Sequence, residues 1–309
     1  LSLRRAAGGV RAVTSPPRLI RWVGCKARLA PWIADRLPPR AGVYCEPFAG
    51  SAAVAFELLA RGVAREVVLG DLNDDVASFL RSVRDCPEAV DEAMRQSRWT
   101  SDPSCYGYVR DLDPFELAPV KRAARFLYLN RLAYNGLYRV NRSGRFNAPP
   151  GDRLGAPACA DLPAMREASE LLRGVVIWSG DYGQTLRVAH ELARGDRVAP
   201  VCYLDPPYDQ AFDAYTAEGW DRSATWRLAD TVRELTARRW RVAASNAATP
   251  CTLTLFGWGR TCATTLRHRV GGRSGRIPLV RELLATNYDR RWRARPEWAK
   301  IPWQGRLLP

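Results

Sequence analysis

Residues Val43 to Asp75 read VYCEPFAGSAAVAFELLARGVAREVVLGDLNDD and show the clearest structural pattern in the chain. The apolar patterning of this stretch switches between strand-like runs and a helical run. The predicted elements are, in order, a strand over 43–48, a helix over 52–61, a strand over 66–71 and a helix that begins at Asn73 or Asp74. Strands that alternate with helices in this way are typical of a parallel sheet covered by helices.

The same pattern returns in the second half of the chain, after a long segment that contains no strong strand. Further strands are predicted over 175–181, 201–204, 241–246 and 281–288, and a further helix over 224–239. The fold class is therefore predicted to be α/β, a Rossmann-like and mostly parallel sheet with a helical insertion. The predicted organisation is a basic arm (1–17), a catalytic domain (18–84 and 171–288), a helical insertion (85–170) and a basic Trp- and Pro-rich tail (289–309).

Composition narrows the class of partner. The 309 residues carry a net charge of +15, mostly from arginine, which favours a polyanionic partner such as a nucleic acid. The eight cysteines form no C-x-x-C pair, and His190 and His268 lie in no metal-ligand pattern. We therefore expect reduced thiols in an intracellular compartment, no metal ion and no zinc or Ser-His-Asp chemistry. No run approaches the roughly 20 apolar residues of a membrane helix, so no membrane partner is expected.

The first 34 residues contain arginines and a lysine but no acidic residue. Segments that are rich in arginine and poor in acids resemble organellar targeting peptides, and the alternative is an ordinary basic arm. The compartment is accordingly predicted to be the bacterial cytoplasm or nucleoid or, alternatively, the mitochondrial matrix or a plastid.

A loop of small residues follows the first predicted strand. The run from Phe48 through Gly50 leads into a helix whose first N–H groups are free, and Asp71 at the end of the next strand could accept hydrogen bonds from ribose hydroxyls. The loop carries neither G-K-[ST] nor G-x-G-x-x-G, so an adenosine cofactor without a pyrophosphate, such as S-adenosylmethionine, fits better. The alternative is a tight turn followed by an Asp that caps a helix.

A second motif, Asp205-Pro206-Pro207-Tyr208, ends the strand over 201–204. Proline cannot donate to a sheet ladder, so these residues stand at the carboxyl edge, where ligands bind in open α/β folds. Asp205 and the Pro206 carbonyl can accept hydrogen bonds from an exocyclic amine of adenine and restore its nucleophilic character. Tyr208 can stack on a base that has been extruded from a duplex.

Four stretches carry a resemblance to a known family: RWVGCKARLAPWI (21–33), EPFAGSAAV (46–54), YLNRLAYNGLYRVNRSGRFNAPPG (128–151) and DPPY (205–208). Over about residues 20–288 the chain resembles the Dam-like, D12-class DNA adenine-N6 methyltransferases. The resemblance implies S-adenosylmethionine-dependent transfer to the N6 amino group of adenine in double-stranded DNA, by base flipping and direct transfer. It also implies that the helical insertion recognises the target. The cofactor contacts that it implies, together with the loop residues above, are Trp22, Lys26, Phe48, Gly50, Asp71, Asp181 and Asp205.

The chain departs from the family at two positions. Cys25 and Ala52 stand where the family usually has glycine, and each adds a side chain near the expected cofactor site. We expect these side chains to weaken cofactor binding without abolishing it.

Basic and amide side chains gather around a predicted Ser143-Gly144 turn, and this combination suits phosphates and base edges. The predicted nucleic-acid contacts are Arg131, Asn135, Arg139, Asn141, Arg142, Arg145 and Asn147. The alternative for this block is a solvated charged face.

Two other functions compete with DNA methylation. The same chemistry could act on RNA, because catalysis on a flipped base does not determine the sugar. Alternatively, the chain could be a catalytically weak or inactive structural subunit of an organellar nucleoprotein complex, such as a mitochondrial ribosome, bound to rRNA and neighbouring proteins. The acid-free arm, the tail and the two lost glycines favour this alternative. The intact DPPY motif and Lys26, one of only three lysines, oppose it.

Overall fold

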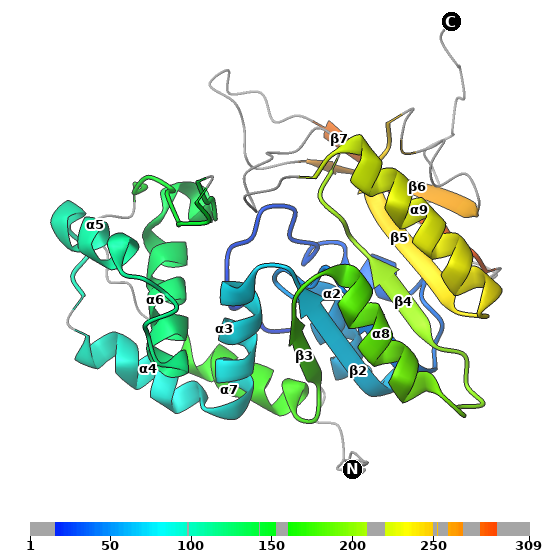
Figure 1. Cartoon of the computed structure of the whole chain (residues 1–309), viewed down its shortest axis with the longest axis horizontal. Helices are drawn as coiled ribbons and strands as arrows, with labels where there is room; N and C mark the ends of the chain where they lie inside the picture. Colours follow the sequence, from blue (N-terminus) through cyan, green and yellow to red (C-terminus); the bar gives the residue numbers. More distant parts are fainter. Residues whose placement is uncertain are drawn as a thin grey trace, which may run out of the picture.

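The computed structural model describes residues 16–97, 99–141, 143–152, 160–208, 220–249, 252, 259–267 and 279–288. Within them a seven-stranded sheet has the order β3-β2-β1-β4-β5-β7-β6 (Figure 1). The strands are β1 (Ala41–Glu46), β2 (Ala64–Asp71), β3 (Val176–Ser179), β4 (Val201–Leu204), β5 (Arg241–Ala247), β6 (Arg260–Arg267) and β7 (Leu279–Thr286). The strands from β3 to β5 pair in parallel, whereas β7 runs antiparallel to both β5 and β6. The predicted α/β class with a mostly parallel sheet is confirmed.

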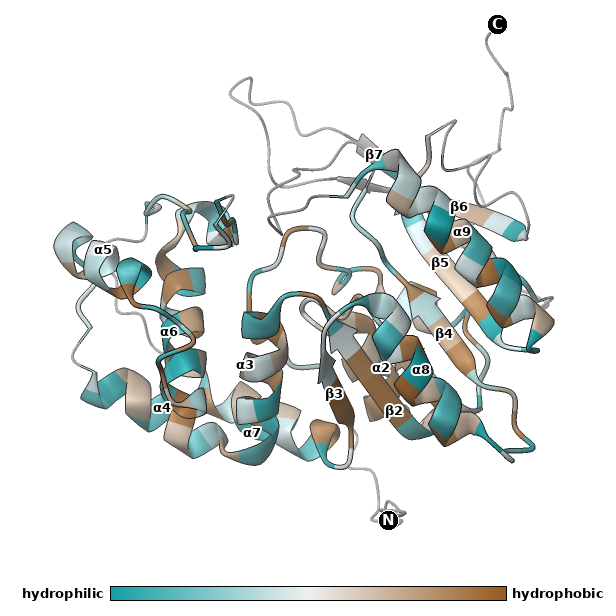
Figure 2. Ribbon diagram, viewed as in Figure 1, coloured by the Kyte–Doolittle hydropathy of each residue, from teal (hydrophilic) through white to brown (hydrophobic). Residues whose placement is uncertain are grey.

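Helices cover both faces of this sheet. The described helices are α1 (Ala30–Ala34), α2 (Ala53–Ala60), α3 (Asp74–Asp85), α4 (Pro87–Gln96), α5 (Pro103–Asp111), α6 (Pro119–Leu132), α7 (Leu162–Leu172), α8 (Tyr182–Ala193) and α9 (Arg222–Ala237). Strand β1 is buried along its whole length, and its side chains alternate between two apolar clusters. Tyr44 joins the cluster shared with α1, α2 and α3, while Val43 and Cys45 join the cluster shared with α8 and α9. Figure 2 accordingly shows mostly hydrophobic inner strands between helices with hydrophilic outer faces.

The observed elements differ from the predicted ones in their boundaries and in elements that were not predicted. Strand β1 ends at Glu46, two residues earlier than expected, because Pro47 has no N–H for the ladder. Of the two predicted caps, Asn73 and Asp74, it is Asn73 that caps α3, and its side chain accepts hydrogen bonds from the N–H groups of Asp75 and Val76. Helix α8 was not predicted, yet parallel strands need a crossover connection and α8 provides the one between β3 and β4. The edge strand β6 was also missed, because its mixed sequence RTCATTLR contains no apolar run.

The segment between α3 and β3 is helical, and in Figure 1 α4, α5 and α6 stand to one side of the sheet. Helix α6 packs against α3 and α4 and is followed by a short 3₁₀ helix, η1 (Tyr134–Gly136). The chain then forms a hairpin-like loop held by isolated bridges between Ala133 and Pro150 and between Val140 and Phe146. We call residues 137–150 the recognition loop.

Several sequence-based expectations concern composition rather than fold. The described cysteines, which are Cys25, Cys45, Cys86, Cys105, Cys202 and Cys262, are all free thiols. No helix among the described residues is long and apolar enough to cross a bilayer. In the same part of the chain, no group of His, Cys, Asp and Glu side chains is arranged to hold a metal ion. Residues 1–15 of the arm, the tail over 289–309 and Arg142 lie outside the described residues.

Candidate active site

The sequence motifs meet at one edge of the sheet. Strand β1 pairs in parallel with β2 on one side and with β4 on the other, so their carboxyl ends point the same way. The loop that begins at Phe48 follows β1, Asp71 ends β2, and Asp205 follows β4. The predicted cofactor loop and the DPPY motif therefore share the edge where open α/β folds bind ligands.

Lys26 is the centre of a buried charged cluster at this edge. Its side chain is only 7% exposed, and its Nζ lies 2.8 Å from Oδ2 of Asp205 and 3.6 Å from Oε1 of Glu282. The ammonium also donates to the carbonyl of Gly24 at 2.9 Å and lies 4.8 Å from the ring centre of Tyr208. A compact ammonium fits among these groups, whereas a planar guanidinium has a different donor geometry, which agrees with a lysine in an arginine-rich chain.

Asp205 is held from its other side by the neighbouring strand. The hydroxyl of Ser245 in β5 donates to Oδ1 of Asp205 at 2.8 Å and lies 2.7 Å from the hydroxyl of Tyr203. Both carboxylate oxygens are thus fixed in direction, which is the preorganisation that a hydrogen-bond acceptor in catalysis requires.

Glu282 sets the orientation of Tyr208. Its side chain is buried in β7 and accepts a hydrogen bond from the Tyr208 hydroxyl. Neither Glu282 nor Ser245 was predicted as a site residue. The available signal was a lone carboxylate at Glu282 inside the apolar run LVRELLAT, since buried charges are rare unless they are paired.

The protonation of the cluster follows from burial and charge. Burial alone would lower the pKa of Lys26, yet Asp205 and Glu282 outweigh it and raise that pKa above its ordinary value. Burial raises the pKa of Glu282 to about 6 against the opposing effect of Lys26. Burial also raises the pKa of Tyr208 well above its ordinary value, so its hydroxyl stays protonated and donates to Glu282.

A third carboxyl group lies beneath the site. Glu46 ends β1, is 3% exposed and accepts a hydrogen bond of 2.7 Å from the hydroxyl of Tyr44. Burial raises the pKa of Glu46 to about 8, although the Tyr44 bond acts in the opposite direction. Glu46 is therefore mainly a neutral acid at pH 7.

Because this pKa is raised, the folded chain holds the proton more tightly than the unfolded chain, and the resulting stability is lost as pH rises through about 8. Between pH 7 and 9 we expect the free energy of unfolding to fall by about 1.4 kcal/mol more in the native chain than in a Glu46→Gln variant. Urea unfolding at both pH values measures the difference, with exposed Glu92→Gln as the control. Equal losses of unfolding free energy in the native chain and in Glu46→Gln would contradict a raised pKa for Glu46.

The cofactor loop is shaped by Asp71. Its Oδ2 accepts the N–H of Gly50 and its Oδ1 the N–H of Asn73, each at 2.8 Å. Gly50 has a φ of +49°, and a Cβ there would come within 2.8 Å of the ring of Trp22. Glycine at this position thus allows the loop to pass directly beside Trp22.

The two departures from the family pattern have different surroundings. Ala52 is fully buried and has a φ of 55°, a left-handed conformation that glycine adopts without strain. Cys25 is exposed, and its sulfur accepts a hydrogen bond from the hydroxyl of Ser51 at 3.2 Å. Ala52 therefore lies in the core under the loop, and Cys25 lies at its surface.

Aromatic rings lie at the other end of the loop. Phe48 stacks on Tyr182, with ring centres 5.4 Å apart, and meets the edge of Trp220 at 5.6 Å. Asp181 caps α8 and accepts the N–H of Gly183 at 2.7 Å, just beyond the carboxyl end of β3. The donor set fits an adenosine cofactor with a charged amino-acid end. Lys26 and carboxylates lie near one end of the loop and aromatic rings near the other, and the glycine turn allows close backbone approach.

The predicted nucleic-acid residues are arranged on and beside the recognition loop. Within the loop, Arg139 donates to Oδ1 and to the carbonyl of Asn147 at 2.8 and 2.9 Å, and Asn141 accepts the N–H groups of Ser143 and Arg145. These amide side chains therefore shape the loop itself.

Three further predicted residues lie around this framework. The side chain of Arg145 is 67% exposed and lies 3.7 Å from Asp113. Asn135 is exposed in η1 with a φ of 53°, and Arg131 donates to the carbonyl of Leu19 at 3.3 Å. Of the described residues in this set, Asn135, Asn141 and Arg145 are exposed, and Arg131, Arg139 and Asn147 are partly buried.

The fold and the site define a methyltransferase of the Rossmann-like class, with a DPPY motif at the end of β4 beside an adenosine-type loop. A family model for D12 class N6 adenine-specific DNA methyltransferases matches residues 22–258. The chain belongs to this family. It is a site-specific, adenine-specific DNA methyltransferase that uses S-adenosylmethionine, as the family resemblance implied.

Similar proteins agree with this assignment. The chain is 30% identical to the type II methyltransferase M1.LlaDCHI of Lactococcus lactis subsp. cremoris, over 87% of this chain and 94% of that protein. It is 31% identical to the type II methyltransferase M.MjaIII of Methanocaldococcus jannaschii, over 74% and 83% respectively. It is also 29% identical to the DNA adenine methylase of Escherichia coli K12, over 86% and 93%. The alternative of a structural subunit in an organellar nucleoprotein complex receives no support from these comparisons.

Proposed function

We propose that the protein methylates the N6 amino group of adenine in double-stranded DNA after the base has been extruded from the helix. The observation that carries the proposal is the carboxylate of Asp205, held between Lys26 at 2.8 Å and Ser245 at 2.8 Å. It stands at the sheet edge that also bears the cofactor loop. A base within a duplex cannot reach such a site, so enzymes of this kind flip their target.

Each DPPY residue has a distinct role in the proposal. S-adenosylmethionine supplies an electrophilic methyl group. Asp205 and the Pro206 carbonyl accept the two N–H groups of the adenine amine, which localises its lone pair for attack. Pro207 stiffens the chain, and Tyr208 stacks on the extruded base with its ring direction set by Glu282. Ser245 and Lys26 act on Asp205 and keep its oxygens in place.

The cofactor is proposed to lie along the loop between Lys26 and the aromatic cluster. One end of this path is bordered by Lys26, Asp205 and Trp22. Gly50 lets the backbone of the loop lie close to the ring of Trp22. Asp71 supports the loop and keeps lone pairs for ribose hydroxyls, because each oxygen accepts only one N–H. Phe48 and Asp181 border the end proposed for the adenine ring.

DNA is proposed to bind across the insertion over 85–170, with the catalytic domain formed by 18–84 and 171–288. The proposed contacts are Arg131, Asn135, Arg139, Asn141, Arg142, Arg145 and Asn147, which lie on or beside the recognition loop. The net charge of +15 supports phosphate binding over this surface. A chromosomal substrate also implies an intracellular location.

Arg145→Ala is expected to weaken DNA binding about equally for all sequences. Its guanidinium is mostly exposed and lies 3.7 Å from Asp113, a long contact that leaves it available for a phosphate. The slope of log K against log salt should fall by about one when a single phosphate contact is removed. Fluorescence anisotropy over a salt series measures the slope. The control is Arg173→Ala, because Arg173 is exposed in the turn between α7 and β3. An unchanged slope would favour the alternative of a solvated face.

The decisive experiment measures transfer from methyl-labelled S-adenosylmethionine to double-stranded DNA, single-stranded DNA and RNA of matched sequence. We expect label in the double-stranded DNA, at adenine N6 after nucleoside digestion. Label mainly in RNA would favour the RNA alternative. Cofactor binding without transfer to any of the three would contradict the proposal.

A further inference from the structure

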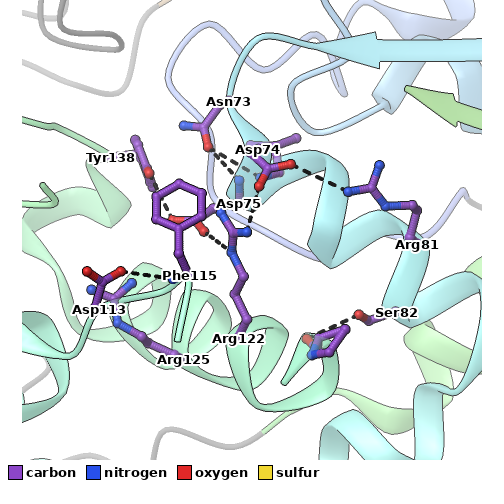
Figure 3. A network of polar contacts seen from close by, with 12 residues as sticks. Asn73, Asp74, Asp75, Arg81, Ser82, Asp113, Phe115, Arg122, Arg125 and Tyr138 are labelled. Carbon is purple, nitrogen blue, oxygen red and sulfur yellow. Dashed lines mark hydrogen bonds and ion pairs between the residues drawn. The ribbon is translucent and has the colours of Figure 1, made fainter. Parts of the chain in front are cut away.

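Tyr138 in the recognition loop reaches into the catalytic half of the molecule. It is 8% exposed, and its hydroxyl donates to Oδ2 of Asp75 at 3.0 Å (Figure 3). Asp75 belongs to the first turn of α3, immediately after the strand that ends at Asp71. Tyr138, which belongs to the loop proposed to contact DNA, is thus hydrogen-bonded to α3. Helix α3 follows Asp71, the residue that holds the cofactor loop.

Asp75, the acceptor of this hydrogen bond, is buried and is held in place by other partners. It is 5% exposed, and its Oδ1 accepts Nε of Arg122 from α6 at 2.7 Å. The same guanidinium donates through Nη1 to Asp74 at 2.6 Å and covers the ring of Phe115 at 4.6 Å (Figure 3). Buried carboxylates with this many partners have few alternative positions, so a shift of Tyr138 must be shared with α3.

From Asp75 the contacts continue to the cofactor loop. Asn73 caps α3 by accepting the N–H of Asp75 at 3.0 Å, and its own N–H donates to Asp71 at 2.8 Å. Asp71 in turn accepts the N–H of Gly50 at 2.8 Å. An unbroken series of hydrogen bonds thus joins Tyr138 to the glycine turn.

Ring contacts supply a second connection between the same two ends. The ring of Tyr138 lies 5.6 Å from that of Trp22, which lies directly against Gly50. Tyr138 also packs edge-on against Phe146 at 5.3 Å, and Phe146 forms a β-bridge with Val140 within the recognition loop. Tyr138 is therefore the residue at which the loop, the N-terminal motif and α3 meet.

We propose that Tyr138 and Asp75 are positioning residues that couple DNA binding to S-adenosylmethionine binding. The inference rests on the proposed function, because it assumes that the recognition loop binds DNA and that the Gly50 turn binds the cofactor. A ligand that orders the recognition loop also orders the Gly50 turn through these hydrogen bonds and ring contacts, and the reverse also holds. Each ligand therefore increases the affinity of the protein for the other. Such coupling is reciprocal: the factor by which DNA tightens the cofactor equals the factor by which the cofactor tightens DNA.

The test measures both dissociation constants, each with and without the other ligand at saturation, in the full chain. The probes are S-adenosylhomocysteine, which cannot donate a methyl group, and a double-stranded oligonucleotide that the protein methylates. Measured coupling factors typically lie at about 5- to 150-fold, and the native chain is expected to fall in this range. Tyr138→Phe, which removes only the hydroxyl, should lower the factor at least about threefold and by more than it changes either separate dissociation constant.

Tyr128→Phe is the matched control, because its buried hydroxyl donates to the carbonyl of Thr100 at 2.7 Å within the insertion and does not contact Asp75. Its coupling factor should equal that of the native chain. Asp75→Ala, which removes the acceptor, should lower the factor as Tyr138→Phe does, and the double variant should lower it no further, because both remove the same hydrogen bond. An unchanged factor in Tyr138→Phe, or an equal fall in Tyr128→Phe, would overturn the inference. So would independent binding in a native chain that methylates DNA, whereas failure of the proposed function would show as no methyl transfer at all.

Discussion

Asp205→Ala is expected to lower kcat for adenine methylation by about 100- to 1,000-fold, as does the loss of other groups that stabilise charge in a transition state. The carboxylate is the proposed acceptor for the adenine amine, and its two oxygens are held by Lys26 and Ser245. Single-turnover transfer of labelled methyl to double-stranded DNA at saturating cofactor isolates this step. Retention of more than about a tenth of the native rate, a loss of under ~1.4 kcal/mol, would exclude the assigned role.

Ser245→Ala separates the carboxylate from its positioning. It leaves Asp205 and its contact with Lys26 in place but removes the 2.8 Å bond to Oδ1. The rate should fall by about tenfold, the value of one ordinary hydrogen bond, and therefore far less than in Asp205→Ala. Equal losses of rate in Ser245→Ala and Asp205→Ala would mean that the placement of the carboxylate, and not the carboxylate itself, accounts for the effect.

Lys26→Met is expected to lower the free energy of unfolding by about 3–5 kcal/mol. The variant leaves Asp205 and Glu282 buried and close together without their shared cation. Urea unfolding at pH 7.5 measures the loss, and isothermal titration of the native and variant chains measures the parallel loss of cofactor affinity. Lowering the pH from 7.5 should recover part of the stability, because the pKa of Glu282, about 6 in the native chain, rises further without Lys26 and that carboxylate takes up a proton.

Arg166→Met is the matched control, because its Nε lies at the same 2.8 Å from a carboxylate, that of Glu88, but both side chains are more than half exposed. Surface ion pairs contribute little, so the loss should lie within the error of the measurement. A Lys26→Met variant as stable as the native chain would show that the buried cluster is not held together by this lysine.

The sheet and its carboxyl edge could be predicted from the sequence alone. Apolar runs alternating with a helical period predict the parallel strands, and Pro206 ends one of them at the edge where open α/β folds bind ligands. The motifs that carry the family likeness are also local, so their order and spacing could be recognised without coordinates. Strand β6 and helix α8 escaped prediction, because an edge strand needs no apolar run and a crossover is required by topology rather than by pattern.

The side chains that complete the site became evident from the three-dimensional structure. Glu282 reaches Lys26 and Tyr208 because β7 pairs antiparallel with β5 in one register, and a register is a property of two strands that the sequence of one does not display. The bond between Tyr138 and Asp75 likewise depends on how α6 and the recognition loop pack on α3. Periodicity and turn chemistry act between neighbours in the chain and can be read from it. Contacts between distant residues depend on the packing of whole elements, and these contacts give the carboxylates and rings of this methyltransferase their partners.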